Sequence, residues 1–166
     1  MTFNIVLVEP EIPQNTGNIV RTCAATGSML HLVGPLGFSI EDRYLKRAGL
    51  DYWKEAKVKY YDNFEELKNK YNNGRFLYAT TKSPKSYSEV EYGDGDFIVF
   101  GKETKGLPED LLEANMSSLL RIPMREQIRS LNLSNSVAVV LYEALRQNEF
   151  RGLETESKRF ECETIV

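Results

Sequence analysis

The sequence predicts an α/β fold built around a mostly parallel sheet flanked by helices. Short apolar runs alternate along the chain with stretches whose apolar residues have helical spacing. Most of these runs end in small or turn-forming residues, as expected where a strand passes into a loop. Sheets of this kind bind their ligands beyond the carboxyl ends of the strands, so functional residues are expected there.

The expected strands are six apolar runs rich in β-branched and aromatic residues. Their length favours buried strands over helices, which are usually longer. They cover residues 4–8, 30–33, 58–61, 76–80, 97–100 and 119–122.

The expected helices occupy most of the intervening segments. The first begins near Asn15 or Thr16, either of which can cap it, and ends at Gly27. The last is a long helix with one apolar face, and shorter helices lie between the two. These later helices are expected at residues 41–48, 63–71, 109–113 and 134–147.

Length and composition predict one globular domain. The chain has 166 residues, of which 42% are hydrophobic and 27% charged. We expect residues 1–150 to form that domain and residues 151–166 to be a polar tail. No apolar run reaches the roughly 18 residues that span a bilayer, and no secretory signal is recognisable, which predicts a cytoplasmic protein without a membrane partner.

The two cysteines and the net charge restrict the possible ligands. Cys23 and Cys162 lack metal-ligand spacing, so no metal site is expected. Cys23 is expected in the core, and Cys162 is expected as an exposed thiol in the tail. The formal net charge of −3 means that any RNA-binding surface must be local.

Four basic clusters are candidates for such a surface, although a solvated face is the better explanation for any one of them. They are Arg43 with Lys46 and Arg47; Lys54 with Lys57 and Lys59; Lys82 with Lys85; and Arg121 with Arg125 and Arg129.

Several common catalytic signatures are absent from the sequence. No Gly-x-Gly-x-x-Gly follows a predicted strand, and no phosphate-binding loop or Gly-x-Ser-x-Gly nucleophile elbow is present. The single histidine, His31, lies in an apolar strand and is expected in the core. These absences disfavour a dinucleotide-dependent enzyme and a serine hydrolase.

Three segments carry more polar chemistry than their positions require. Residues 15–21 place Asn18 and Arg21 on one helical face. In residues 100–108, two glycines bracket a charged stretch directly after a strand, and glycine lets a backbone approach a ligand closely. Residues 130–136 hold three serines and two asparagines at a helix start, where one cap would suffice.

Together these segments resemble the three motifs of the SpoU branch of the SPOUT methyltransferase superfamily. Asn18 and Arg21 match the first motif, and Gly101, Glu103 and Gly106 match the second. The third motif is matched by residues 122–124 and 130–134. Within the branch, the chain is similar to the small tRNA wobble-nucleotide 2′-O-methyltransferases of the TrmL (YibK) type. This further similarity rests on residues 4–7, 9–13, 47–52, 80–82 and 94–96, and the whole match runs from residue 3 to 150.

The resemblance implies an enzyme that moves a methyl group from S-adenosylmethionine to a ribose 2′-hydroxyl. The implied substrate is the wobble nucleotide, cytidine or modified uridine 34, in the anticodon loop of tRNA. The resemblance also implies a homodimer and a C-terminal trefoil knot, which no sequence pattern would suggest. Carried over by position, the cofactor-binding residues are Ala79, Gly101, Ile122, Ser130 and Leu131, and the catalytic residues are Arg21, Asn18, Glu103 and Asn132.

The residues leave parts of the mechanism open. A guanidinium does not accept protons, so Arg21 is expected to stabilise the developing oxyanion or to clamp a phosphate. The general base is either that phosphate or Glu103. Two other functions remain, namely methylation of a different RNA nucleotide and RNA binding by a SPOUT protein that has lost catalysis. The intact Asn18, Arg21, Glu103 and Asn132 disfavour the second.

Overall fold

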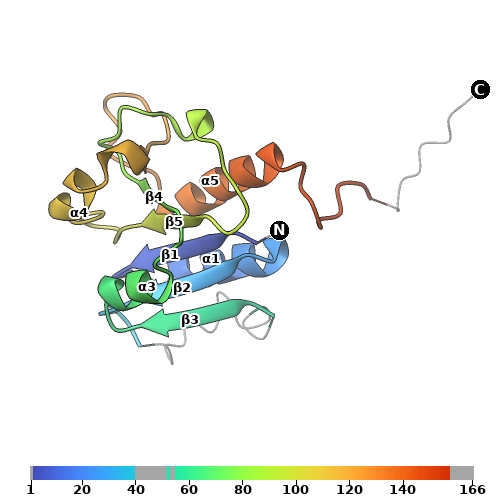
Figure 1. Ribbon diagram of the computed structural model, residues 1–166, viewed down its shortest axis with the longest axis horizontal. Coiled ribbons are helices and arrows are strands. Elements are labelled where there is room, and N and C mark those ends of the chain that lie inside the picture. The colour runs from blue at the N-terminus through green and yellow to red at the C-terminus, as the bar shows by residue number, and fades with distance from the viewer. Residues whose placement is uncertain (1, 40–51, 53–54, 158–166) are drawn as a thin grey trace, which may run out of the picture.

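The computed structural model describes residues 2–39, 52 and 55–157 (Figure 1). Its six strands form one sheet in the order β3-β2-β1-β5-β4-β6, and every pairing between them is parallel. This arrangement confirms the predicted α/β class. The strands are β1 (Asn4–Val8), β2 (Met29–Val33), β3 (Lys57–Tyr61), β4 (Phe76–Ala79), β5 (Phe97–Phe100) and β6 (Leu119–Leu120).

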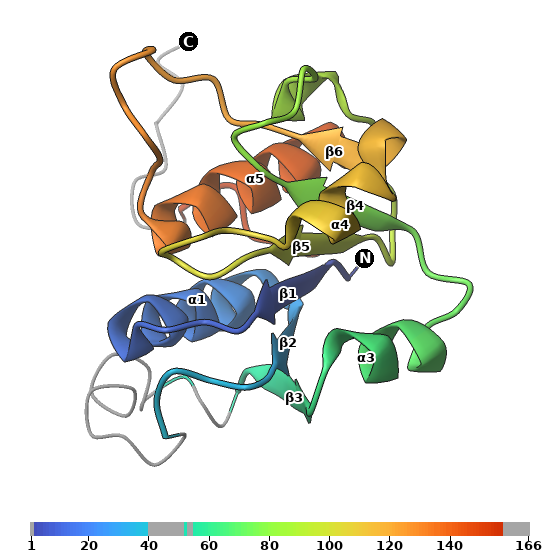
Figure 2. The ribbon, with the colours of Figure 1, turned by 90° about the vertical axis from the view of Figure 1, so that its left-hand side faces the viewer.

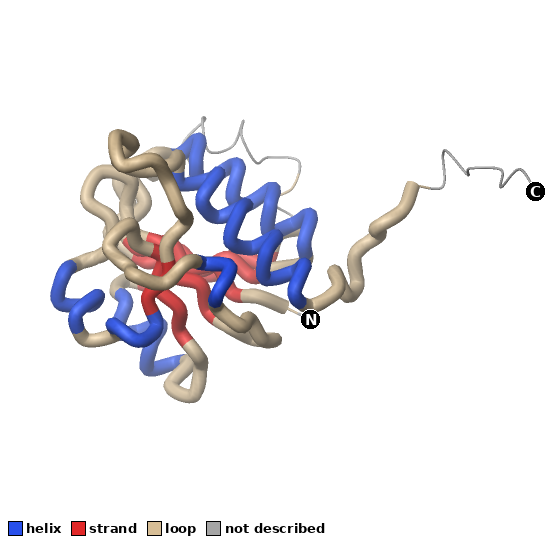
Figure 3. The backbone as a smooth tube through the Cα atoms, turned by 90° about the horizontal axis from the view of Figure 1, so that it is seen from above, coloured by secondary structure: helices blue, strands red, loops and turns tan. Residues whose placement is uncertain are grey.

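Helices cover both faces of the sheet. The two long helices α1 (Pro13–Thr26) and α5 (Leu133–Gln147) lie side by side on one face (Figures 2 and 3). The short helices α3 (Phe64–Lys70) and α4 (Glu109–Glu113) lie on the other face. Two single 3₁₀ turns, η1 (Tyr87–Glu89) and η2 (Met116–Ser118), complete the described elements.

Alternation along the strands divides the apolar interior into two cores. In β1, Ile5 and Leu7 pack into the core under α1 and α5, whereas Val6 and Val8 pack into the core under α3 and α4. A strand that is buried on both faces needs apolar residues at every position, which explains the uninterrupted apolar run that marked it in the sequence.

The start of α1 differs from the prediction. The helix begins at Pro13, with Ile12 as its N-cap residue, so Asn15 and Thr16 lie inside the first turn and neither is the N-cap. Proline suits this position because its missing N–H would have no partner in the first turn of a helix. The end of α1 is confirmed, since Gly27 has a left-handed φ of 69° and closes the helix.

Other boundaries match closely or shift by one or two residues. Asn63 caps α3 as predicted, and Asn132 caps α5. Strand β6 ends at Leu120, two residues earlier than predicted, so Ile122 lies in the following loop. The predicted helix at 41–48, its basic cluster and Cys162 lie outside the described residues.

The predictions for His31 and Cys23 are confirmed, because both side chains are fully buried. No helix of the described residues is long and apolar enough to cross a membrane. Residues 151–157 follow α5; Leu153 still packs against the core, and the residues after it run away from the body of the molecule (Figure 1).

Candidate active site

A pocket of about 500 Å³ opens at the carboxyl ends of three neighbouring strands, β4, β5 and β6. Its walls are the segments that follow these strands together with the start of α5. Apolar side chains form much of the lining, among them Phe100, Leu107, Leu120, Met124 and Leu133. An apolar pocket at this edge of a parallel sheet is the usual site for a small ligand.

All five residues that were predicted to bind a cofactor line this one pocket. Ala79 ends β4, Gly101 follows β5, and the other three lie between β6 and α5. The structure therefore brings together residues that are up to 52 positions apart in the sequence, the separation of Ala79 and Leu131.

The loop after β5 requires both of its glycines. A Cβ atom on Gly101 would lie 2.1 Å from the carbonyl carbon of Gly106 and 2.2 Å from the backbone nitrogen of Leu107. Gly106 itself has a φ of 72°, in the left-handed region that glycine tolerates best. Its N–H donates to the Lys102 carbonyl at 2.9 Å, so the loop folds back on itself against the pocket.

Glu103 binds the residues that lead into helix α1. Its carboxylate accepts hydrogen bonds from the backbone N–H of Glu11 at 2.8 Å and of Ile12 at 3.2 Å, and from Nδ2 of Asn15 at 2.9 Å. A carboxylate next to the first turn of a helix also matches the positive end of the helix dipole. Glu103 thus ties the second motif to the first.

Asn15 continues this connection to the third motif. Its Oδ1 accepts a 2.9 Å hydrogen bond from Nδ2 of Asn132, and Oδ1 of Asn132 accepts from the backbone N–H of Ser134 at 2.9 Å. One chain of hydrogen bonds therefore runs from Glu103 through Asn15 and Asn132 to the start of α5. Sequence reasoning treated Asn15 only as a possible cap, although its buried amide is the centre of this chain.

Asn18 and Arg21 lie apart from the pocket lining. Both are exposed on α1, and neither is among the residues that line the cavity. The Arg21 guanidinium lies 4.8 Å from the centroid of the Tyr52 ring and donates a 3.3 Å hydrogen bond to the Tyr52 hydroxyl. Within one chain, the structure thus groups the predicted cofactor residues but leaves the predicted catalytic arginine outside the pocket.

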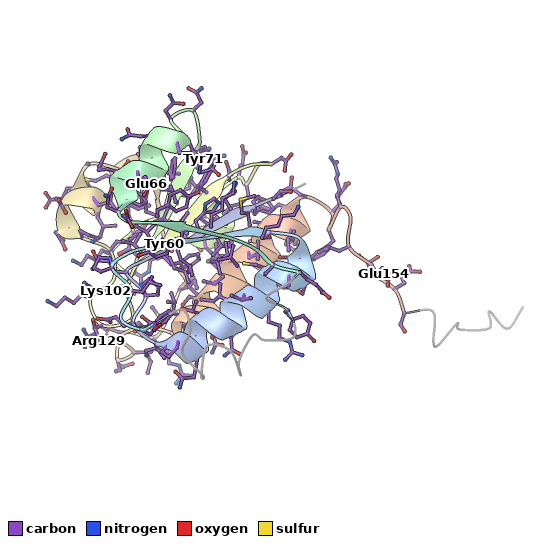
Figure 4. The ribbon with its side chains drawn as sticks, turned by 90° about the horizontal axis from the view of Figure 1, so that it is seen from below. Tyr60, Glu66, Tyr71, Lys102, Arg129 and Glu154 are labelled. Carbon is purple, nitrogen blue, oxygen red and sulfur yellow. The ribbon has the colours of Figure 1, made fainter. Side chains whose placement is uncertain are left out.

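Positive side chains stand around the pocket. Lys82 pairs with Glu109, Lys102 pairs with Glu9 at 2.7 Å, and Arg129 donates to the Thr104 carbonyl at 3.1 Å. Figure 4 shows Lys102 and Arg129 at the same end of the molecule. The ion pair with Glu9 raises the pKa of Lys102, which keeps this lysine positively charged.

The described residues contain no group of three or more His, Cys, Asp or Glu side chains that could hold a metal ion. The pocket is bounded by apolar walls and backbone groups, and lysine and arginine side chains lie at its rim. This combination defines an α/β protein that binds a small cofactor-like molecule next to a surface suited to a polyanion.

Comparison with known proteins places the chain in one family. The model of the SpoU rRNA Methylase family matches residues 2–142, and the chain belongs to this family.

Individual relatives match over nearly their full length. A Listeria innocua protein, provisionally assigned as a tRNA (cytidine(34)-2′-O)-methyltransferase, is 56% identical over 156 residues, which cover 92% of each chain. The tRNA (cytidine(34)-2′-O)-methyltransferase of Methylovorus glucosotrophus is 51% identical, covering 90% of this chain and 98% of the relative. A solved structure concerned with the 2-OH methylation of C/U34 on tRNA is 42% identical with a TM-score of 0.86, covering 90% of this chain and 98% of the other.

Proposed function

We propose that this protein methylates the ribose 2′-hydroxyl of nucleotide 34 in tRNA, with S-adenosylmethionine as the methyl donor. The observation that carries the proposal is the convergence of Ala79, Gly101, Ile122, Ser130 and Leu131 on a single pocket. Relatives at 51% and 56% identity are named for this activity, as a firm and a provisional assignment respectively, and they match over nearly their full length.

The pocket fits the chemistry of this donor. A side chain at Gly101 would collide with the backbone of its own loop, so the lining at this point is bare backbone that a ligand can approach closely. Ile122 and Leu131 offer an apolar wall for an adenine ring, and free backbone groups can recognise its polar edge. The bound donor supplies an electrophilic methyl group on a cationic sulfur, and the protein must hold the ribose oxygen in line with it.

We assign Glu103 a positioning role and not that of general base. Three hydrogen bonds, from the N–H groups of Glu11 and Ile12 and from Nδ2 of Asn15, occupy its carboxylate and hold it in place. Of the two bases that the sequence left open, the substrate phosphate is therefore the better candidate. Asn132 likewise acts by fixing the start of α5, whose neighbours Ser130 and Leu131 line the pocket.

Arg21 is proposed to stabilise the developing oxyanion or to clamp the adjacent phosphate. Because Arg21 does not line the pocket of its own chain, the proposal includes a homodimer in which Arg21 of the partner subunit completes each site. Helix α5 exposes Val139 and Tyr142, at 37% and 48%, one helical turn apart, and a second copy of the chain would cover them. Asn18, which precedes Arg21 by three residues on the exposed face of α1, would contact the same substrate.

Several further features belong to the same proposal. We propose that residues 1–150 form one methyltransferase domain with a trefoil knot in its C-terminal part, and that residues 151–166 form a tail. Family membership supports the knot, as does the arrangement of the segments after β4, β5 and β6 around one pocket. The anticodon loop would meet the positive rim near Lys102 and Arg129, and the protein would act in the cytoplasm, where tRNA is modified.

The decisive experiment is transfer of a labelled methyl group to tRNA that lacks wobble methylation, followed by mapping of the modified nucleotide. Label on the 2′-oxygen of nucleotide 34 is the expected result. Label elsewhere would support the alternative of another RNA nucleotide, and tRNA binding without transfer would support an inactive RNA-binding protein.

The dimer proposal has its own test by complementation. We expect Arg21→Ala and Gly101→Val each to be inactive, the first because it lacks the arginine and the second because it lacks the pocket. In a mixed dimer, one of the two sites would combine an intact pocket with an intact Arg21 of the partner subunit. Recovery of activity on mixing supports the shared site, and absence of recovery after verified subunit exchange argues for a site within one chain.

A further inference from the structure

Two loops far apart in the sequence are joined by a dense set of polar contacts. One is the β1–α1 loop, residues 9–12, and the other is the β5–α4 loop, residues 101–107. We call the contacts between them the loop clamp. They comprise the ion pair Glu9–Lys102, the hydrogen bonds from Thr104 to Glu11, and the hydrogen bonds from the Glu11 and Ile12 backbone to Glu103.

The contacts at Glu11 run in both directions. The Glu11 N–H donates to the Glu103 carboxylate at 2.8 Å. In return, Oε2 of Glu11 accepts from the hydroxyl of Thr104 at 2.8 Å and from the backbone N–H of Thr104 at 3.2 Å. Each loop thus supplies both a carboxylate and a donor to the other, which fixes their relative position better than a single contact would.

The clamp lies where the order of the strands reverses. Strand β1 pairs with β2 on one side and with β5 on the other, so the loops after β1 and β5 leave the sheet next to each other. In parallel sheets this is the place where ligands bind. The β5–α4 loop lines the pocket, and the β1–α1 loop leads directly into the helix that carries Asn18 and Arg21.

The backbone of the β1–α1 loop is held in a costly conformation. Glu9 has a φ of 50°, a left-handed value that a residue with a side chain adopts at an energetic cost. Its carboxylate binds Lys102 at 2.7 Å, so contacts across the clamp offset part of that cost. Strain of this kind persists only where the surrounding structure specifies it, which indicates that the position of this loop matters for function.

We propose that Glu11 is a positioning residue for the methyl transfer, and that its carboxylate holds the segment 102–106 against the donor pocket and in register with helix α1. This inference rests on the proposed function, because it assigns the pocket to the donor. Glu11 lies outside the pocket lining, so it acts through Thr104 and through the backbone of its own loop. The Glu11 carboxylate therefore acts as the acceptor for two donors of the opposite loop, the hydroxyl and the backbone N–H of Thr104.

Calorimetric titration with S-adenosylmethionine tests the proposal on the full-length protein. Loss of a charged hydrogen-bond acceptor is expected to weaken donor affinity about tenfold in Glu11→Ala. Thr104→Val removes only the hydroxyl donor and is expected to weaken affinity by a smaller factor, whereas Thr104→Ser keeps the hydroxyl and should bind as the wild type does. Glu126→Ala removes an exposed carboxylate from the segment between β6 and α5, and it controls for the change in net charge.

A positioning role and a merely structural role differ in how they affect KM for the donor and the melting temperature. If Glu11 positions the pocket wall, KM for the donor rises while the melting temperature stays near that of Glu126→Ala. Equal donor affinity in folded Glu11→Ala and in the wild type would overturn the proposal. If Glu11→Ala does not fold, the donor affinities of Thr104→Val and Thr104→Ser are compared instead. Equal affinity in these two variants would overturn the proposal.

Amide hydrogen exchange separates this inference from the proposed function. In Glu11→Ala we expect the Thr104 amide to exchange about tenfold faster, since its acceptor is gone, while amides of β1 exchange as before. Unchanged exchange at Thr104 would overturn the clamp even if the donor binds. A wild-type protein that binds no donor would instead overturn the proposed function, and the exchange of Thr104 would still decide whether Glu11 holds the loop.

Discussion

Nδ2 of Asn132 donates a 2.9 Å hydrogen bond to Oδ1 of Asn15, and this bond joins the first turns of the two long helices. Nδ2 of Asn15 in turn donates to Glu103, so the Asn15 amide needs both its donor and its acceptor. An amide serves both neighbours at neutral pH because it carries a donor and an acceptor on the same side chain.

Replacement of Asn15 by aspartate is expected to destabilise the protein by about 1–3 kcal/mol at pH 7. The new carboxylate would lose the donor to Glu103 and would stand next to it as a like charge. Protonation of one member of the pair relieves the repulsion, so the deficit relative to the wild type should shrink as the pH falls towards 4. Urea unfolding at several pH values measures this, with Asn18→Asp on the exposed face of α1 as the control. A full-sized deficit that does not change with pH would contradict the explanation.

Replacement of Arg21 by alanine is expected to leave donor binding intact and to lower turnover by roughly 10² to 10⁴. The physical reason is that Arg21 is exposed and does not line the pocket, while its charge is proposed to act on the reacting oxygen or its phosphate. Single-turnover methylation and donor calorimetry check the two halves of this prediction. Arg151→Ala, an exposed arginine after α5, serves as the control. Near-normal turnover in Arg21→Ala would remove the assigned role.

Replacement of Gly101 by alanine is expected to abolish donor binding and to cost at least about 1–3 kcal/mol of stability. The new Cβ would lie 2.1 Å from the Gly106 carbonyl carbon, and that neighbour is backbone, which cannot rotate away. Gly93→Ala is the matched control, because the new Cβ would lie 4.0 Å from its nearest neighbour, an oxygen of Asp96, and the φ of Gly93 is not positive. If Gly101→Ala binds the donor normally, the loop must be able to adopt another conformation.

The buried His31 predicts a loss of stability in mild acid. Burial lowers the pKa of His31 from its ordinary 6.5 to about 4, and the positive charges of Lys59 and Lys70 add to the effect. The unfolded chain therefore binds a proton that the folded chain excludes between these values. The contribution of neutral His31 is fully present above pH 6.5 and is lost as the pH falls to about 4, by roughly 3 kcal/mol in total.

The His31→Gln variant tests this explanation by unfolding in urea between pH 7 and 4. The ring nitrogens of His31 lie 3.1 Å from the Tyr61 hydroxyl and 3.0 Å from Oδ1 of Asn4, so the variant is expected to be less stable at pH 7. Its stability should depend less on pH than that of the wild type over the same range. Parallel pH profiles for the two proteins would show that other groups cause the acid sensitivity.

Local sequence patterns predicted the strands well, because a strand buried on both faces appears in the sequence as a run of consecutive apolar residues. In β1 and β5 every position is buried, and every residue is apolar except Asn4 at the start of β1. The start of α1 was predicted wrongly for the opposite reason. Its start is held by the Glu103 carboxylate, which accepts hydrogen bonds from the N–H groups of Ile12 and Glu11, 91 and 92 residues away, and no local pattern reports such a partner.

The candidate site likewise contains residues that local motifs predicted and contacts between distant segments that they did not. The five cofactor positions were predicted through the resemblance of short motifs, and the structure gathers these residues around one pocket. The part played by Asn15, and the contacts of Glu11 with Thr104, were not predicted, because each depends on a pairing between segments about 90 residues apart. The role of Glu103 also became clear only from its partners, since a carboxylate in a glycine-bracketed loop is equally compatible with a base.

The bond between Asn15 and Asn132 spans 117 residues of sequence, which has a consequence for biosynthesis. While the ribosome is still adding β5, the first motif has already been made, but its partners do not yet exist. The carboxylate that holds the start of α1 arrives only with residue 103, and the amide that joins the two helices arrives only with residue 132. Contacts of such long range form slowly and late. The pocket lining extends to Ser136, so a nascent chain lacks the complete pocket until most of the chain has been made.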